Sequence, residues 1–139
     1  MKTKDRTWDS IAVGERASLE HVVTAEDVDS FAVISGDHNP LHTDATYARK
    51  TQFKKRVVHG MYLAALVSQL VGMHLPGKRA LLMKESLEFK KPVHIDDVIR
   101  VEGHVTAKSD STKILTIDIS ISVGSTHVAG GVVSVRVLV

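Results

Sequence analysis

The segment Ser35–Asp44, SGDHNPLHTD, holds more side chains that can transfer a proton than any other stretch of the chain. Asp37 and His42 lie five residues apart across Pro40, and a proline-stiffened loop can turn both toward one point. A carboxylate beside an imidazole forms a general acid–base pair, because the imidazole titrates near neutral pH. Asn39 can support the loop by bonding the backbone or the Asp37 carboxylate. In the alternative interpretation, Asp37 and Asn39 are ordinary turn residues and His42 is a helix cap or a satisfied polar group.

A second candidate lies within Arg56–Leu66, RVVHGMYLAAL, where Gly60 opens a strongly apolar stretch. If a helix begins at Gly60, its first N–H groups have no intrahelical acceptor and carry partial positive charge. A glycine there lets a ligand oxygen approach the amide closely, as in an oxyanion hole. The competing interpretation is that Gly60 only permits tight packing or a bend.

Two other kinds of site fit the sequence less well. Four side chains could supply nitrogen and oxygen ligands to a metal ion: His38, His42, Asp44 and His59. Their spacing matches no metal-binding motif, so we expect no metal site. The chain has no cysteine, which excludes disulfides and thiolate chemistry. Neither Ser35 nor Ser68 lies in a Gly-x-Ser-x-Gly turn, so we expect no serine nucleophile.

The apolar pattern predicts the elements that position these residues. Thr24, followed by an acid three residues on, predicts the start of a helix that ends at Gly36, and residues 44–50 can form a short helix. Gly60–Met73 is apolar on nearly every face, which predicts a buried helix. Alternation predicts strands over 99–107, 115–123 and 133–137, with shorter or weaker strands over 17–23 and 81–90. The pattern therefore predicts an α+β fold in which an antiparallel sheet covers a buried helix.

Composition limits the class of protein. A chain of 139 residues with 43% hydrophobic and 24% charged residues is typical of one folded domain, 1–139. A net charge of +2 does not indicate nucleic-acid binding, and the basic run 54–56 is a solvated loop or a contact for a phosphate-bearing ligand. Met1–Asp9 does not resemble a signal peptide, and the apolar run 60–75 is short for a membrane span. We therefore expect a cytoplasmic protein with no nucleic-acid or membrane partner.

Residues Phe31–Gly72 resemble the MaoC-like family of hot-dog proteins, the (R)-specific enoyl-CoA hydratases. The resemblance rests on the Asp-x-Asn-Pro-Leu-His core at 37–42 and on Val-His-Gly-Met at 58–61, and it covers about a third of the chain. It implies a hot-dog fold, in which an antiparallel β-sheet wraps around one long central helix. It also implies a homodimer or a dimer-based oligomer, with sheets joined side by side and an acyl tunnel at the interface.

The resemblance implies a role for each matching residue. Asp37 and His42 correspond to the catalytic pair that activates water, and Gly60 corresponds to the amide that binds the thioester oxygen. Asn39 corresponds to a loop residue that supports the pair. Ser68 falls where the family arranges the acyl pocket or the catalytic groups. No metal or redox cofactor is implied, because coenzyme A or the pantetheine arm of an acyl-carrier protein belongs to the substrate.

These residues and the resemblance together predict a hydro-lyase of fatty-acid metabolism. The predicted reaction is the reversible addition of water to trans-2-enoyl thioesters, with (R)-3-hydroxyacyl thioesters as products. One alternative is an acyl-CoA thioesterase on the same scaffold, since fold alone does not determine function. The other is an acyl-CoA-binding module without catalytic activity.

Overall fold

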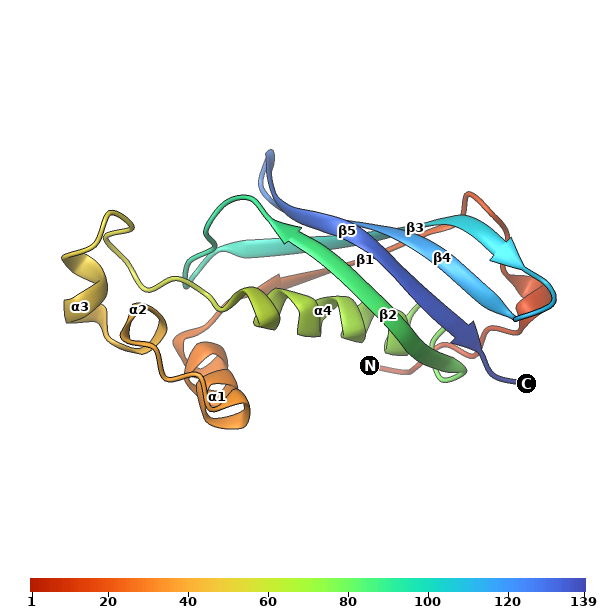
Figure 1. The fold of residues 1–139 in the computed structure, drawn as a ribbon, viewed down its shortest axis with the longest axis horizontal. Coiled ribbons are helices and arrows are strands. Elements are labelled where there is room, and N and C mark those ends of the chain that lie inside the picture. The colour runs from red at the N-terminus through yellow and green to blue at the C-terminus, as the bar shows by residue number, and fades with distance from the viewer.

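A five-stranded antiparallel sheet lies over helix α4 in the computed structural model, which describes residues 1–139 (Figure 1). The strands are β1 (Arg16–Val22), β2 (Ala80–Phe89), β3 (Val98–Ser109), β4 (Ile114–Val123) and β5 (Thr126–Val137). The helices are a 3₁₀ turn (Trp8–Ser10), α1 (Ala25–Ser35), α2 (Pro40–Thr43), α3 (Ala45–Arg49) and α4 (Gly60–Met73). Helices α1 to α3 extend beyond one end of the sheet, the end at which α4 begins (Figure 1).

The sheet has the strand order β1-β3-β4-β5-β2, so β1 and β2 are its edges. Apolar residues on the inner face alternate with polar residues on the outer face, as the sequence predicts. The buried members include Val101, Val105, Leu115, Ile117, Ile121, Val133 and Val135. They form one cluster with the buried side chains of α4, and burying each such side chain contributes about 1.5–3 kcal/mol.

Helix α1 begins and ends as the sequence predicts. The Thr24 hydroxyl accepts the Asp27 N–H at 3.0 Å, and the Asp27 carboxylate accepts the Thr24 N–H at 2.9 Å. This capping box satisfies donors that would otherwise be unpaired. Gly36 ends the helix with φ 77°, a left-handed conformation that favours glycine. The polar loop therefore starts from a fixed direction.

Helix α4 has the predicted bounds and buries Leu63, Leu66, Val67 and Leu70 against the sheet. The prediction of burial on nearly every face holds for the sheet-facing side only. The opposite side exposes Met61, Ala65 and Ser68, because the sheet of one chain covers the helix from one direction (Figure 1). None of the helices combines the length and the apolar character that crossing a lipid bilayer requires.

Strand β5 begins at Thr126, seven residues before the predicted start at 133. His127 and the pair Gly130–Gly131 hide the strand, because they interrupt the alternation of apolar and polar residues. Position 131 has no room for a side chain, because a Cβ there would lie 1.8 Å from the Ser86 carbonyl oxygen of β2. The glycines therefore allow β2 to approach β5 closely.

Candidate active site

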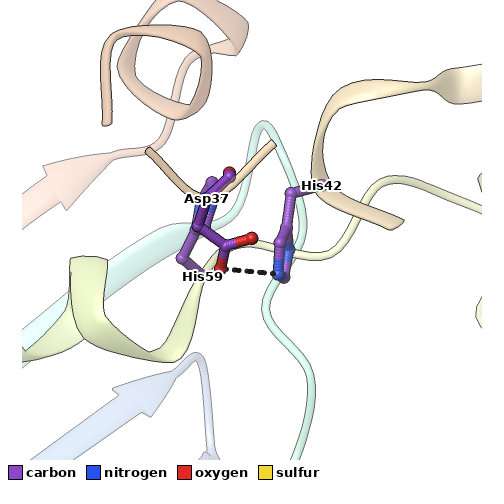
Figure 2. A group of neighbouring side chains, drawn as sticks. All are labelled: Asp37, His42 and His59. Atoms are coloured by element: carbon purple, nitrogen blue, oxygen red, sulfur yellow. Dashed lines mark hydrogen bonds and ion pairs between the residues drawn. The ribbon is translucent and has the colours of Figure 1, made fainter. Parts of the chain in front are cut away.

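The loop between α1 and α2 brings Asp37 and His42 together, as its sequence predicts (Figure 2). Asp37 Oδ2 lies 3.9 Å from His42 Nε2. The His42 side chain is 14% exposed and the Asp37 side chain 52% exposed, so the pair lies at the boundary between the interior and solvent. At this separation the two groups do not hydrogen-bond directly, but one small molecule can contact both.

The environment of His42 selects its tautomer. His42 Nδ1–H donates to the Val57 carbonyl at 2.6 Å, so in the neutral ring Nε2 carries the lone pair and faces Asp37. The one-turn helix α2 projects the ring, with Pro40 at its first position and the Asn39 side chain accepting the Leu41 N–H at 3.0 Å. His42 is therefore oriented as a proton acceptor.

Asn39 supports the loop in two ways. Its side chain caps α2, and its backbone N–H donates to Asp37 Oδ1 at 3.1 Å. The sequence leaves open whether Asn39 bonds the backbone or the Asp37 carboxylate. In the structure its side chain bonds the backbone, and its main-chain N–H bonds the carboxylate. The Asp37 N–H also donates to Ser35 Oγ at 3.1 Å. These contacts leave Asp37 Oδ2 directed toward His42.

His59 connects the two residues, although its place in the sequence did not indicate a catalytic role. Its ring is 2% exposed and stacks on His42, with centroids 3.9 Å apart and planes 26° apart (Figure 2). His59 Nε2–H donates to the Asp37 main-chain carbonyl at 2.9 Å, while Nδ1 is buried without a partner. A neutral ring with its proton on Nε2 satisfies this geometry. The feature of the sequence that could have pointed to His59 is its place directly before Gly60.

A metal site fits these residues poorly. Asp37, His42 and His59 place one ligand atom each within 4.8 Å of one another. However, one nitrogen of each histidine donates to a carbonyl, and the other nitrogen of His59 is buried without a partner. Apart from the enclosed His59 Nδ1, only His42 Nε2 and the Asp37 carboxylate are accessible, whereas a catalytic zinc site uses three protein ligands. His38 is exposed, and Asp44 instead caps α3.

His42 and Gly60 line the same cavity, which has a volume of about 410 Å³. Gly60 is the first residue of α4, and its N–H donates to no acceptor in the chain. A Cβ at this position would lie 3.3 Å from the Phe89 ring, so glycine keeps the space beside the amide open. The cavity is otherwise lined mainly by Phe53, Val57, Val58, Leu63, Phe89 and Val93. An imidazole base and an unused amide donor therefore face one apolar cavity.

Ser68 lies apart from this cavity. It is on the exposed side of α4, eight residues after Gly60, which corresponds to about 12 Å along a helix. Ser68 is not among the residues that line the cavity. Within one chain, the structure does not bring Ser68 to Asp37 and His42.

A polar network anchors the first turn of α4 behind the cavity. His21 Nε2 of β1 lies 2.8 Å from both the Tyr62 hydroxyl and Asp27 Oδ2. Burial and the nearby Asp27 carboxylate raise the pKa of Tyr62. Partial burial would raise the pKa of Asp27, but hydrogen bonds from Thr24 and His21 outweigh this effect and lower it. The network therefore ties α4 to β1 and α1 and fixes the position of the Gly60 amide.

Comparison with known proteins identifies the family. The family model described as "MaoC like domain" matches residues 10–127. The chain belongs to the MaoC-like family. A relative in this comparison, the (R)-specific enoyl-CoA hydratase of Aeromonas caviae, is 43% identical over 108 residues, which cover 78% of this chain and 81% of that enzyme. The 3-hydroxybutyryl-CoA dehydratase of Methylorubrum extorquens is 33% identical over 130 residues, covering 94% and 83% of the two chains.

Solved structures of MaoC-like proteins share the architecture. The (R)-hydratase from A. caviae superimposes with a TM-score of 0.89 at 39% identity, over 92% of this chain and 98% of that one. The R-hydratase PhaJ1 from Pseudomonas aeruginosa gives a TM-score of 0.93 at 30% identity, over 98% and 88% of the two chains. The predicted α+β hot-dog fold is therefore confirmed.

Proposed function

We propose that this MaoC-like protein is an (R)-specific enoyl-CoA hydratase, a hydro-lyase that adds water reversibly to trans-2-enoyl thioesters. The observation that carries the proposal is the Asp37–His42 pair, 3.9 Å apart, beside a cavity that also presents the Gly60 amide. Relatives named as (R)-specific enoyl-CoA hydratases support the same reaction. The thioester withdraws electrons from the double bond, so the protein has to position water and stabilise the charge that develops on the carbonyl oxygen.

In the proposed mechanism, one water molecule lies between the pair. A water about 2.8 Å from each of two atoms that are 3.9 Å apart donates one hydrogen to His42 Nε2 and the other to Asp37 Oδ2. Its lone pair then faces the β-carbon of the substrate. His42 accepts the proton as the oxygen attacks, and the Asp37 carboxylate stabilises the imidazolium that forms. The stacked His59 keeps the imidazole ring in this orientation.

The negative charge that moves onto the thioester oxygen is stabilised by the Gly60 N–H and the partial positive charge of the α4 N-terminus. The proton taken from water is then delivered to the α-carbon. Water has supplied both the hydroxyl at the β-carbon and the hydrogen at the α-carbon, so the reaction balances without a redox cofactor or a metal. Dehydration follows the same steps in reverse.

The reaction is tested with crotonyl-CoA and the purified protein. The expected result is loss of the enoyl thioester with formation of (R)-3-hydroxybutyryl-CoA, identified by chiral analysis, without release of free thiol. Thiol release without hydration would favour the thioesterase alternative. Absence of turnover with enoyl chains from four to ten carbons would contradict the proposed function.

We propose that the substrate is a thioester of coenzyme A, and that its coenzyme A part binds to a basic rim. This rim is formed by Arg49, Lys54, Lys55, Lys90 and Lys91. The first three line a hollow of about 310 Å³, and the last two line the catalytic cavity. None of the five makes an ion pair within the chain, and no acid occurs between Asp44 and Glu85. Asp96 also lines the hollow, but the unpaired Arg49, Lys54 and Lys55 outnumber it, and this excess of positive charge suits compact phosphate groups.

The double substitution Lys54→Gln/Lys55→Gln is expected to raise KM for crotonyl-CoA by about tenfold, equivalent to ~1.4 kcal/mol, with kcat little changed. The KM for crotonyl-pantetheine, which carries no such phosphate groups, should not increase. Lys2→Gln serves as a control for the loss of positive charge alone. Steady-state kinetics at two salt concentrations provide the measurement, because phosphate contacts weaken with ionic strength. An equal increase in KM for both thioesters would exclude phosphate recognition by these lysines.

We also propose that the protein is a homodimer joined along β2, which is an edge strand. Its outer edge and the nearby side of α4 expose Leu81, Met83, Phe89 and Met61. Pairing β2 with its copy would satisfy the free edge and cover these apolar groups, and it would enclose Ser68.

We further propose that residues 1–139 act as one domain, supported by a core cluster that runs from Ile11 to Val137. The absence of cysteine agrees with a reducing compartment such as the cytoplasm.

Light scattering coupled to size-exclusion chromatography tests the dimer. The expected mass is twice that of the 15.2 kDa chain. Met83→Asp is expected to shift it toward the monomer, since it places a charge on the paired edge. Val33→Asp, on the exposed side of α1, should leave the mass unchanged. A wild-type protein that elutes as a monomer at every concentration would contradict the proposal.

A further inference from the structure

Glu85 is an acid in an apolar setting. It lies on β2 and lines a hollow of about 210 Å³, with Met61, Ala64, Leu87 and Phe89 as the other walls. Its Oε1 is buried and has no hydrogen-bond partner. Burial raises the pKa of this carboxyl group. An unpartnered buried polar group is destabilising, so the position calls for an explanation beyond packing.

This hollow adjoins the catalytic cavity. Phe89 lines both spaces, and its ring lies 3.3 Å from the point where a Cβ on Gly60 would stand. Within the first turns of α4, Gly60 faces the catalytic cavity, while Met61 and Ala64 face the hollow. The half-exposed Phe89 side chain is thus the divider between them. The two spaces therefore meet at this ring.

We propose that the hollow receives the distal part of the acyl chain, and that Glu85 is a specificity-determining residue that restricts the enzyme to short chains. This inference rests on the proposed hydratase function. A crotonyl group has only one carbon beyond the double bond and need not reach the hollow. Each further methylene would gain about 0.8 kcal/mol in a fully apolar pocket. Beside Glu85 that gain is opposed, because the chain would lie against a carboxyl group whose Oε1 has no hydrogen-bond partner.

The stability effect of Glu85 supports a functional role. Because burial raises its pKa in the folded state, the folded protein holds the proton more tightly than the unfolded chain. The stability from this group is complete below the unfolded pKa and is lost as pH rises through the folded value. At neutral pH a neutral side chain should therefore be more stable than Glu85. A residue that lowers stability beside an active site is a candidate for function.

The test compares kcat/KM for crotonyl-CoA and trans-2-octenoyl-CoA in wild type, Glu85→Met and Glu85→Gln. Met matches the length of Glu but is apolar, and Gln keeps the shape and polarity without the charge. The octenoyl-to-crotonyl ratio is expected to rise by about tenfold or more in Glu85→Met, as two or more buried methylenes would give. The rise should be smaller in Glu85→Gln. Glu88→Met, exposed on the opposite face of β2, should leave the ratio unchanged.

A second measurement does not require turnover. Octanoyl-CoA should raise the melting temperature of Glu85→Met more than that of wild type, whereas butyryl-CoA should stabilise both equally. A soluble, folded Glu85→Met with an unchanged ratio and unchanged octanoyl stabilisation would overturn the inference, as would a Glu88→Met that changes the ratio equally. If wild type binds acyl-CoA but hydrates no enoyl thioester, the proposed function fails, and the octanoyl result still decides whether Glu85 limits chain length.

Discussion

His42→Ala is expected to lower kcat for crotonyl-CoA hydration by about a thousandfold, within the range that a positioned general base contributes. The substitution removes the Nε2 lone pair that faces Asp37, while Val57 loses only one donor to its carbonyl. His38→Ala is the matched control, because His38 lies in the same loop with an exposed side chain. It should change kcat by less than about twofold, as is usual for a surface position.

Chemical rescue separates the loss of a base from the loss of structure in His42→Ala. Imidazole added to the variant can occupy the space beside Gly60 and should restore part of the activity, with a dependence on the concentration of neutral imidazole. A melting temperature close to that of wild type would confirm that the fold survives. Activity within tenfold of wild type, or an equal loss in His38→Ala, would contradict the role of His42.

Gly60→Pro is expected to lower kcat by about a hundredfold or more relative to Gly60→Ala, the usual effect of removing one oxyanion donor. Both substitutions add a Cβ that meets the Phe89 ring at 3.3 Å, but only proline removes the N–H. Gly60 is the first residue of α4, a position that tolerates proline. His59, with φ −56° and ψ 135°, already has the extended conformation that proline requires of the preceding residue.

The measurement for Gly60 is kcat at saturating crotonyl-CoA, together with the melting temperature of each variant. Gly60→Ala reports the effect of the added methyl group, so the difference between the two variants isolates the amide. Equal kcat values for two folded variants would show that the Gly60 N–H does not stabilise the transition state.

Much of the fold could be predicted because local patterns determine it. Gly60–Met73 was predicted with the observed bounds, since apolar residues occupy most positions from the opening glycine to the end of the helix. Thr24 and Gly36 marked the ends of α1 through local hydrogen bonds and a left-handed backbone. Asp37 and His42 converge because Pro40 begins, and Asn39 caps, a one-turn helix directly after Asp37.

The remaining features depend on contacts between distant segments. His59 reaches the Asp37 carbonyl across 22 residues, and no periodicity reports such a contact. Glu85 is a polar residue in a weakly alternating edge strand, so its burial depends on where α4 packs. Ser68 is exposed because one chain covers only one side of α4. Sequence spacing could not indicate which side of that helix stays uncovered.

A double-mutant cycle tests the shared catalytic water most directly. It compares kcat/KM for crotonyl-CoA in Asp37→Asn, His42→Ala and the double variant, with Asp118→Asn on the exposed face of β4 as a control. If the two side chains activate one water, each single substitution removes most of the activity. The kcat/KM of the double variant should then lie within about threefold of that of the less active single variant, as for residues that act as a unit. Losses that multiply, or an Asp37→Asn variant with wild-type activity, would contradict a shared catalytic water.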